Sequence, residues 1–249
     1  EEDIDLQGTN IDAVDIALDA KKNLNIEGAE NKEQTITNTS SSSWSVGGTI
    51  GTGFFGNASK GSGKENENST TNTESEIDAS GTLTLKSGED TNITGSKVSG
   101  EKVVARISGD LNIASVQDTD DYAAKNQSSG FGFTTGTKGG VTGSVNQGKT
   151  DSTYASVTEQ AGIFAGKDGF DIIVGKNTDL KGAVIASEAT ADKNKLTTGT
   201  LTYSDIQNKA NYNSSSIGAN LNTKPDAKYN EQGLTPVIGV TASGNEDST

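Results

Sequence analysis

The chain has 249 residues, of which 30% are hydrophobic and 22% charged, and 31 are glycine. An average globular domain is closer to half apolar, so a thick hydrophobic core is excluded. The choice is between disorder and a β-structure with a thin core. The formal net charge is −14, with Arg106 as the single arginine, which argues against nucleic acid as a partner.

Cysteine, histidine and methionine are absent. Disulfide bonds, thiol nucleophiles and imidazole acids, bases or metal ligands are therefore excluded. We expect no catalytic residue, no cofactor and no metal site in this chain.

An internal repeat begins at the first residues. Segments 3–11, 90–98 and 177–185 align without gaps at a shift of 87 positions. Repetition at a constant shift is typical of stacked repeat architectures. The aligned copies cover about 1–87, 88–174 and 175–249, and we interpret 1–249 as one β-helical repeat region. The chain starts inside a repeat, so we expect it to be a fragment of a much larger protein. The aligned positions include Leu6, Ile93 and Leu180, and Gly8, Gly95 and Gly182.

Within each copy, apolar residues form short pairs with one polar residue between them, such as Leu24 and Ile26. This spacing places two side chains on one face of a strand, and the pairs recur after 20 positions, as from Leu6 to Ile26. The pattern predicts an all-β fold, a right-handed parallel β-helix. A β-sandwich is the alternative, and segment 119–127 could form one helical turn. The predicted inward residues are Leu6, Ile11, Leu24, Ile26, Leu83, Leu85, Ile93, Val98, Leu111, Ile113, Phe170, Ile172, Leu180, Ile185 and Leu201.

Two glycine-rich segments, 45–55 and 131–145, alternate apolar with small residues over a longer run. Alternation of this kind predicts protruding β-hairpins, and the polar segment 59–73 is predicted to be a mobile loop. The hairpins either lie over the helix and cap its sheet or contact a membrane or a receptor, since lipid-facing strands alternate in this way. The residues expected at such a contact are Trp44, Val46, Ile50, Phe54, Phe55, Phe131, Phe133, Val141 and Val145.

The acidic run Asp118, Asp120 and Asp121 is the best candidate for chemistry. Paired carboxylates could serve glycoside hydrolysis or hold Ca²⁺. We interpret the run as a hydrated turn, because acidic runs are usually solvated.

Segments 108–119, 154–166, 169–172, 177–187, 198–201 and 204–210 resemble the haemagglutinin repeats of the filamentous haemagglutinin family, and the similarity weakens past about residue 220. The resemblance is to the second repeat region of contact-dependent growth inhibition effectors. It implies a secreted cell-surface protein of a Gram-negative bacterium, exported by two-partner secretion.

For function, the resemblance implies a non-enzymatic segment that helps to deliver a C-terminal toxin across the outer membrane of a target cell. The alternatives are an adhesin stalk and, as a third class, a β-helical polysaccharide-degrading enzyme. The expected partners are the target-cell outer membrane or a surface receptor. A two-partner secretion transporter would act through a domain outside this chain. We expect the chain itself to be monomeric.

Overall fold

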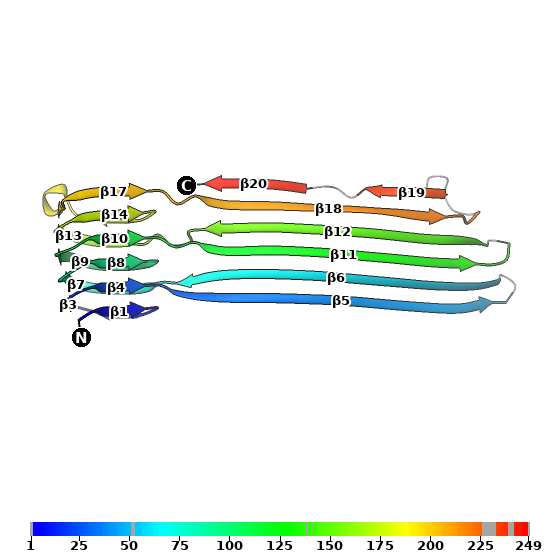
Figure 1. Cartoon of the computed structure of the whole chain (residues 1–249), viewed down its shortest axis with the longest axis horizontal. Coiled ribbons are helices and arrows are strands. Elements are labelled where there is room, and N and C mark those ends of the chain that lie inside the picture. Colours follow the sequence, from blue (N-terminus) through cyan, green and yellow to red (C-terminus); the bar gives the residue numbers. More distant parts are fainter. Residues whose placement is uncertain (1, 51–52, 138, 226–232, 239–241, 249) are drawn as a thin grey trace.

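The computed structural model describes residues 2–50, 53–137, 139–225, 233–238 and 242–248. Nearly all of them lie in β-strands, and the single helical element among them is the 3-10 turn η1 (Ala191–Lys193). No helix in these segments has the length and hydropathy needed to cross a membrane. The all-β prediction is confirmed. Short parallel strands form a body at one end of the molecule, and long antiparallel strands extend away from it (Figure 1).

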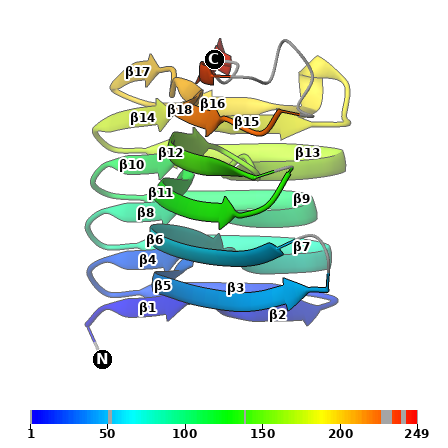
Figure 2. The same ribbon diagram turned by 90° about the vertical axis from the view of Figure 1, so that its right-hand side faces the viewer.

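The strands of this body belong to two parallel sheets that the chain visits in turn as it passes through stacked layers (Figure 2). The first sheet contains β1 (Ile4–Gln7), β4 (Leu24–Glu27), β8 (Thr91–Thr94), β10 (Leu111–Ala114), β14 (Asn177–Lys181) and β17 (Thr200–Ser204), in this spatial order. The second contains β2 (Asn10–Ala13) and β3 (Ile16–Ala20), then β7 (Ser75–Ser87), β9 (Ser96–Ile107) and β13 (Gly162–Val174), then β15 (Val184–Ser187) and β16 (Lys195–Thr197). We call these strands the coil body.

The register of the first sheet reproduces the sequence repeat. Ile26 lies beside Leu6, 20 positions earlier, and beside Ile93, 67 positions later. Ile113 lies beside Ile93 and Leu180 at the same two spacings. The short and long steps together make the 87-position shift, and each long step contains one of the protruding hairpins.

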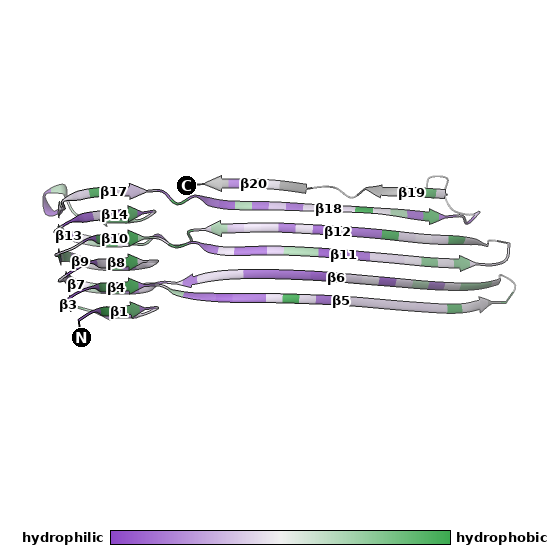
Figure 3. Ribbon diagram, in the orientation of Figure 1, coloured by the Kyte–Doolittle hydropathy of each residue, from purple (hydrophilic) through white to green (hydrophobic). Residues whose placement is uncertain are grey.

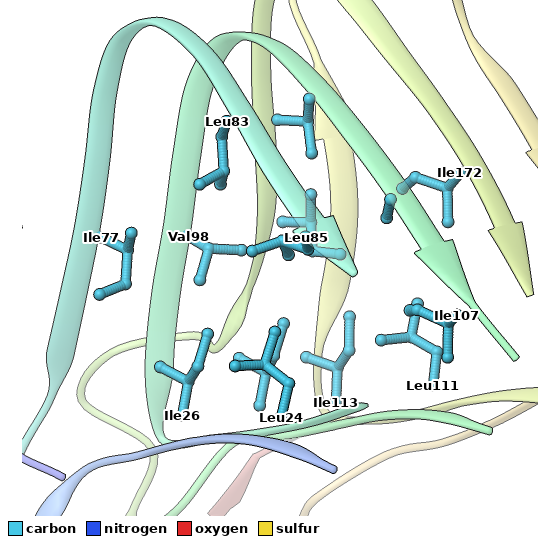
Figure 4. Packing of buried hydrophobic residues seen from close by; sticks show 14 of the residues in the cluster. Leu24, Ile26, Ile77, Leu83, Leu85, Val98, Ile107, Leu111, Ile113 and Ile172 are labelled. Carbon is cyan, nitrogen blue, oxygen red and sulfur yellow. The ribbon is translucent and has the colours of Figure 1, made fainter. Parts of the chain in front are cut away.

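Aliphatic side chains fill the space between the two sheets (Figure 4). Parallel sheets buried on the inner face need such a column, because each layer covers the apolar side chains of the next. The fully buried members, which the sequence placed inside, are Leu24, Ile26, Leu83, Leu85, Ile93, Val98, Leu111, Ile113 and Ile172. Five further predicted residues pack partly buried against this cluster: Leu6, Ile11, Phe170, Leu180 and Ile185.

The prediction for Leu201 is wrong, because its side chain is 51% exposed. It lies on β17, the outermost strand of the first sheet. No described strand pairs with the outer edge of β17, so no layer covers Leu201.

The glycines that align in the repeat turn the chain at equivalent corners. Gly8, Gly95 and Gly182 have φ values of +54°, +54° and +57°, a left-handed conformation that disfavours any residue with a Cβ. A Cβ on Gly95 would also lie 2.5 Å from Cγ2 of Val116. The repeated glycines are therefore a requirement of backbone geometry.

Long strands form a separate antiparallel sheet, which we call the hairpin sheet. Its spatial order is β19, β18, β12, β11, β6, β5, with β20 also beside β18. The strands are β5 (Ala29–Thr49), β6 (Gly53–Thr73), β11 (Asp118–Thr134), β12 (Gly140–Ser156), β18 (Asn208–Asn222), β19 (Gly233–Ile238) and β20 (Ala242–Ser248).

Three expectations about this region are wrong. Segment 59–73 is not a loop but part of β6, which pairs with β5 on one side and β11 on the other. Its polar side chains face water on an extended sheet whose backbone hydrogen bonds are satisfied by both neighbours. Segment 119–127 belongs to β11 and forms no helical turn. The hairpins do not cap the coil body, because they extend away from it (Figure 1).

Candidate functional site

The candidate site lies in the half of the hairpin sheet that is remote from the coil body. This distal half comprises segments 39–63, 126–148 and 215–222 together with β19. The half next to the coil body is mostly hydrophilic, whereas hydrophobic residues become frequent toward the far end (Figure 3). The site predicted from the sequence falls in this distal half.

Cross-strand register brings the apolar residues of the hairpins to one face. Residues directly opposite each other on neighbouring strands point to the same side of a sheet. One such row runs across the sheet through Trp44, Ala58, Phe131, Gly143, Leu221 and Leu234. The next row toward the tip contains Val46, Gly56, Phe133 and Val141, and the preceding row contains Ser42, Lys60, Ser129, Val145 and Ala219. We call this side of the distal half the apolar face.

The apolar face is open to solvent in the isolated chain. Trp44 is 79% exposed, Phe131 56% and Leu234 73%. A shallow groove over the face is lined by Ala58, Phe131, Val145, Ala219, Leu221 and Leu234. Contiguous exposed apolar surface of this kind marks a contact with a protein or a membrane.

Glycines let aromatic rings lie across neighbouring strands of this face. A Cβ on Gly56 would be 2.6 Å from Cε1 of Phe133, and one on Gly48 would be 2.9 Å from Cδ1 of Phe54. Each ring therefore covers the backbone of a glycine on the next strand. The glycine-rich composition thus serves close aromatic packing on a flat sheet.

The opposite face of the distal half is polar. The row behind Trp44 and Phe131 consists of Ser43, Ser59, Gly130, Ser144 and Asn220. Among the described residues of β5, β6, β11, β12 and β18 on this face, Phe55 is the large apolar exception, and its ring lies over Gly47. The distal half is therefore amphipathic across its thickness, with mostly apolar side chains on one face and mostly polar side chains on the other.

The structure brings together most of the predicted contact residues. Trp44, Val46, Phe54, Phe131, Phe133, Val141 and Val145 share the apolar face. Phe55 lies on the opposite face, and Ile50 lies in the turn after β5 with its side chain fully exposed. The sequence reasoning missed Ile217, Leu221 and Leu234. The signal was available, because the serine cluster before Ile217 matches those that precede the first two glycine-rich segments.

Acidic residues are excluded from the distal half. Segments 34–64, 122–150 and 206–225 contain no Asp or Glu, although the chain has 34 of them and a net charge of −14. Lys60 is the one charged residue in the three rows named above. Its alkyl stem is apolar and lets the ammonium group reach toward a more polar level.

The interpretation of the acidic run as a turn is wrong, because Asp118, Asp120 and Asp121 lie in β11, which begins at Asp118. Burial raises the pKa of the Asp118 carboxyl group, but hydrogen bonds from the Thr158 hydroxyl and from the backbone and side chain of Asn72 outweigh burial and lower that pKa below its ordinary value. Asp118 and Asp121 lie on opposite faces of β11, as their odd spacing in a strand requires. The described part of the chain has no group of three or more acidic residues arranged to hold a metal ion.

Comparison with known proteins identifies related sequences over most of the chain. A family model described as "Hemagglutinin repeat" matches residues 1–129 and 124–219. The chain is 43% identical over 217 residues to a protein named "Toxin CdiA" from Escherichia coli, which covers 83% of this chain and 7% of that protein.

Two further relatives carry the names of different nucleases. A "Deoxyribonuclease CdiA" from Yersinia pseudotuberculosis serotype O:3 (strain YPIII) is 42% identical over 228 residues, which is 89% of this chain and 21% of the relative. A "tRNA nuclease CdiA" from Escherichia coli (strain NC101) is 40% identical over 257 residues, which is 98% of this chain and 8% of the relative. The chain thus spans between 7% and 21% of the length of these relatives. No solved structure matches the chain.

Proposed function

The chain belongs to the hemagglutinin-repeat family that includes the CdiA toxins, and on this basis we propose that it is a non-catalytic membrane-contact segment of a secreted surface exoprotein. Its hairpin sheet would meet the outer membrane of a target cell with the apolar face and help to deliver a C-terminal toxin. Export would use a two-partner secretion transporter that acts on another domain of the longer protein.

One observation carries the proposal, namely the solvent-exposed apolar face on a distal half that lacks acidic residues. Lipid-facing strands keep every second side chain apolar, because a charged side chain facing hydrocarbon is costly. On one side of the hairpin sheet, the rows through Trp44 and Val46 follow this rule, since they hold only apolar residues and glycine. The preceding row adds Val145 and Ala219 but also contains Lys60 and two serines. The other side of the distal half is polar, which suits water or a chain in transit.

The names of the relatives support a non-catalytic role. The deoxyribonuclease and the tRNA nuclease share this segment at nearly equal identity, 42% and 40%. A segment common to proteins named for different substrates does not select the substrate. We infer that the nuclease activities of such proteins lie outside the region that corresponds to this chain.

The coil body serves in this proposal as the rigid base of the hairpin sheet. We infer that it is a right-handed parallel β-helix, because connections between parallel strands of one sheet are right-handed in about 98% of cases. We also infer one continuous repeat region over 1–249, with copies at about 1–87, 88–174 and 175–249, and a monomeric chain.

The edges of the hairpin sheet place one condition on penetration of the membrane. Among the described strands, β5 pairs only with β6, so its other edge carries unpaired backbone groups. Such groups are not tolerated in hydrocarbon. We infer that, once the monomeric chain has bound to the membrane, strands of a second copy pair with this edge, so that the sheet can enter the hydrocarbon.

Flotation of the purified chain with neutral phosphatidylcholine vesicles tests the proposal. Membrane contact through the hairpin sheet predicts that the chain floats with the vesicles. An adhesin stalk that recognises a protein or glycan receptor predicts that the chain stays at the bottom of the gradient. If the chain floats with none of the vesicle compositions tested, the proposal is overturned in favour of adhesion.

A further inference from the structure

Three lysines form a row across the hairpin sheet at the boundary of its distal half. Lys64 on β6 lies directly opposite Lys125 on β11, and Lys125 lies directly opposite Lys149 on β12. Their alignment places the three side chains on one side of the sheet, and the same register places this side in common with the apolar face. We call these residues the lysine row.

The row is electrostatically unfavourable in the isolated chain. Like charges directly opposite each other on neighbouring strands destabilise a sheet. Lys149 has a partner, since its Nζ lies 2.5 Å from Oδ2 of Asp151. Among the described residues, no ion pair or hydrogen bond involves the ammonium group of Lys64 or Lys125, and both side chains are exposed. An anion bound between them would remove the repulsion.

The distance from the lysine row to the tip of the hairpin sheet is close to the thickness of the hydrocarbon core of a bilayer. Lys125 lies nine positions before Thr134, the last residue of β11, a distance of about 30 Å in an extended strand. The hydrocarbon core of a bilayer is also about 30 Å thick. The row further marks a change in composition, because the acid-free segments end at Glu65 and Asp151, next to Lys64 and close to Lys149.

We propose that the lysine row binds the phosphate groups of anionic lipid headgroups and thereby fixes how deep the apolar face enters the membrane. This inference rests on the proposed membrane contact and adds a defined ligand to it. The ammonium groups would lie at the headgroup level while the rows from Lys60 to the tip face the acyl chains. The acidic half of the sheet and the acidic coil body would remain in water, where their charge does not oppose binding at short range.

Vesicle binding with and without anionic lipid separates this inference from the proposed function. The net charge of −14 predicts weaker binding to phosphatidylglycerol than to phosphatidylcholine vesicles if no local basic site exists. The lysine row predicts the opposite order. Each basic residue near an anionic surface contributes about fivefold in affinity, so K64Q/K125Q should lower binding to phosphatidylglycerol vesicles about 25-fold and leave binding to phosphatidylcholine unchanged.

A matched control removes the same charge elsewhere. Lys102 and Lys195 are exposed residues of the coil body, and K102Q/K195Q should retain the affinity of the natural chain for phosphatidylglycerol. K64R/K125R should retain it as well, and equal urea midpoints should show that all variants are folded. Free inorganic phosphate at millimolar concentration should not displace the chain from vesicles, since the row is a membrane site.

Each outcome has a distinct reading. Binding to phosphatidylcholine without any gain on phosphatidylglycerol would overturn the lysine row and leave the apolar face supported. Equal losses in K64Q/K125Q and K102Q/K195Q would also overturn it, because the effect would then follow net charge. Failure to bind either vesicle would overturn both the row and the proposed function.

Discussion

A charge placed on the apolar face should weaken membrane binding far more than the same charge one residue away. Val145 lies on the apolar face and is 55% exposed, whereas Ser144 precedes it on β12 and points to the polar face. Val145 is four positions from Lys149, about 14 Å along the strand. If the lysine row lies at one interface, Val145 therefore lies near the middle of the hydrocarbon core.

The expected magnitude follows from this depth. An arginine that faces lipid near the bilayer midplane costs about 2–4 kcal/mol, which is roughly 30-fold to 900-fold in affinity. Val145→Arg should lower partition into phosphatidylcholine vesicles by such a factor. Ser144→Arg carries the same charge at the same depth on the polar face, so its effect should stay below about fivefold. Flotation over a range of lipid concentrations measures both partition coefficients.

Comparison of Val145→Arg with Ser144→Arg also controls for effects of the substitutions on folding. Both positions are on the surface of the hairpin sheet, and substitutions there change stability little compared with core substitutions. Equal urea midpoints for the two variants would show that the sheet is intact. Equal partition of the two variants at equal stability would refute the one-sided geometry of membrane contact.

Four further predictions address the fold and the site. Ile113→Ala removes a core side chain that is 1% exposed and should lower the free energy of unfolding by about 2–5 kcal/mol, whereas Leu201→Ala should change it by less than about 1 kcal/mol in the same urea titration. Gly95→Ala should cost about 1–3 kcal/mol in thermal or urea unfolding, because φ is +54° and Val116 blocks the Cβ. Lys60→Leu removes the charge from the row that also holds Val145 and should raise partition into neutral vesicles by about 30-fold or more. The pKa of Asp118 is lowered in the folded state, so its stabilisation is present above the unfolded pKa of about 3.9 and is lost as pH falls through the lower folded pKa; the stability difference between the natural chain and Asp118→Asn should therefore shrink in acid.

The sequence was sufficient for those features that repeat. Leu24, Ile26 and Ile113 were placed inside because two-residue spacing and an 87-position shift specify one face of a stacked strand. Gly8, Gly95 and Gly182 could be aligned, although only the backbone angles explain why they are glycine. The predicted burial of Leu201 is wrong, because periodicity gives the direction of a side chain but not whether another layer covers it.

The hairpins were harder to predict from sequence. Segment 59–73 has no apolar pattern, and it is a strand because β5 and β11 satisfy its backbone on both sides. Sequence parity grouped residues within one hairpin, but the common face of Trp44, Phe131 and Leu221 depends on pairing between hairpins that lie far apart in the sequence. The lysine row depends on the same long-range register and has no local signal.

Trp44 offers the most direct test of membrane contact because it is the only tryptophan of the chain and lies on the apolar face with 79% of its surface exposed. It is six positions from Asn38, which pairs with Lys64, and therefore about 20 Å from the lysine row. The measurement is its fluorescence in phosphatidylcholine vesicles that carry bromine at defined depths along the acyl chain. Contact of the apolar face with the membrane predicts a blue shift of the emission, strong quenching by deep bromines and protection from aqueous iodide. Emission that stays unshifted, remains open to iodide and is not quenched by any brominated lipid would contradict it.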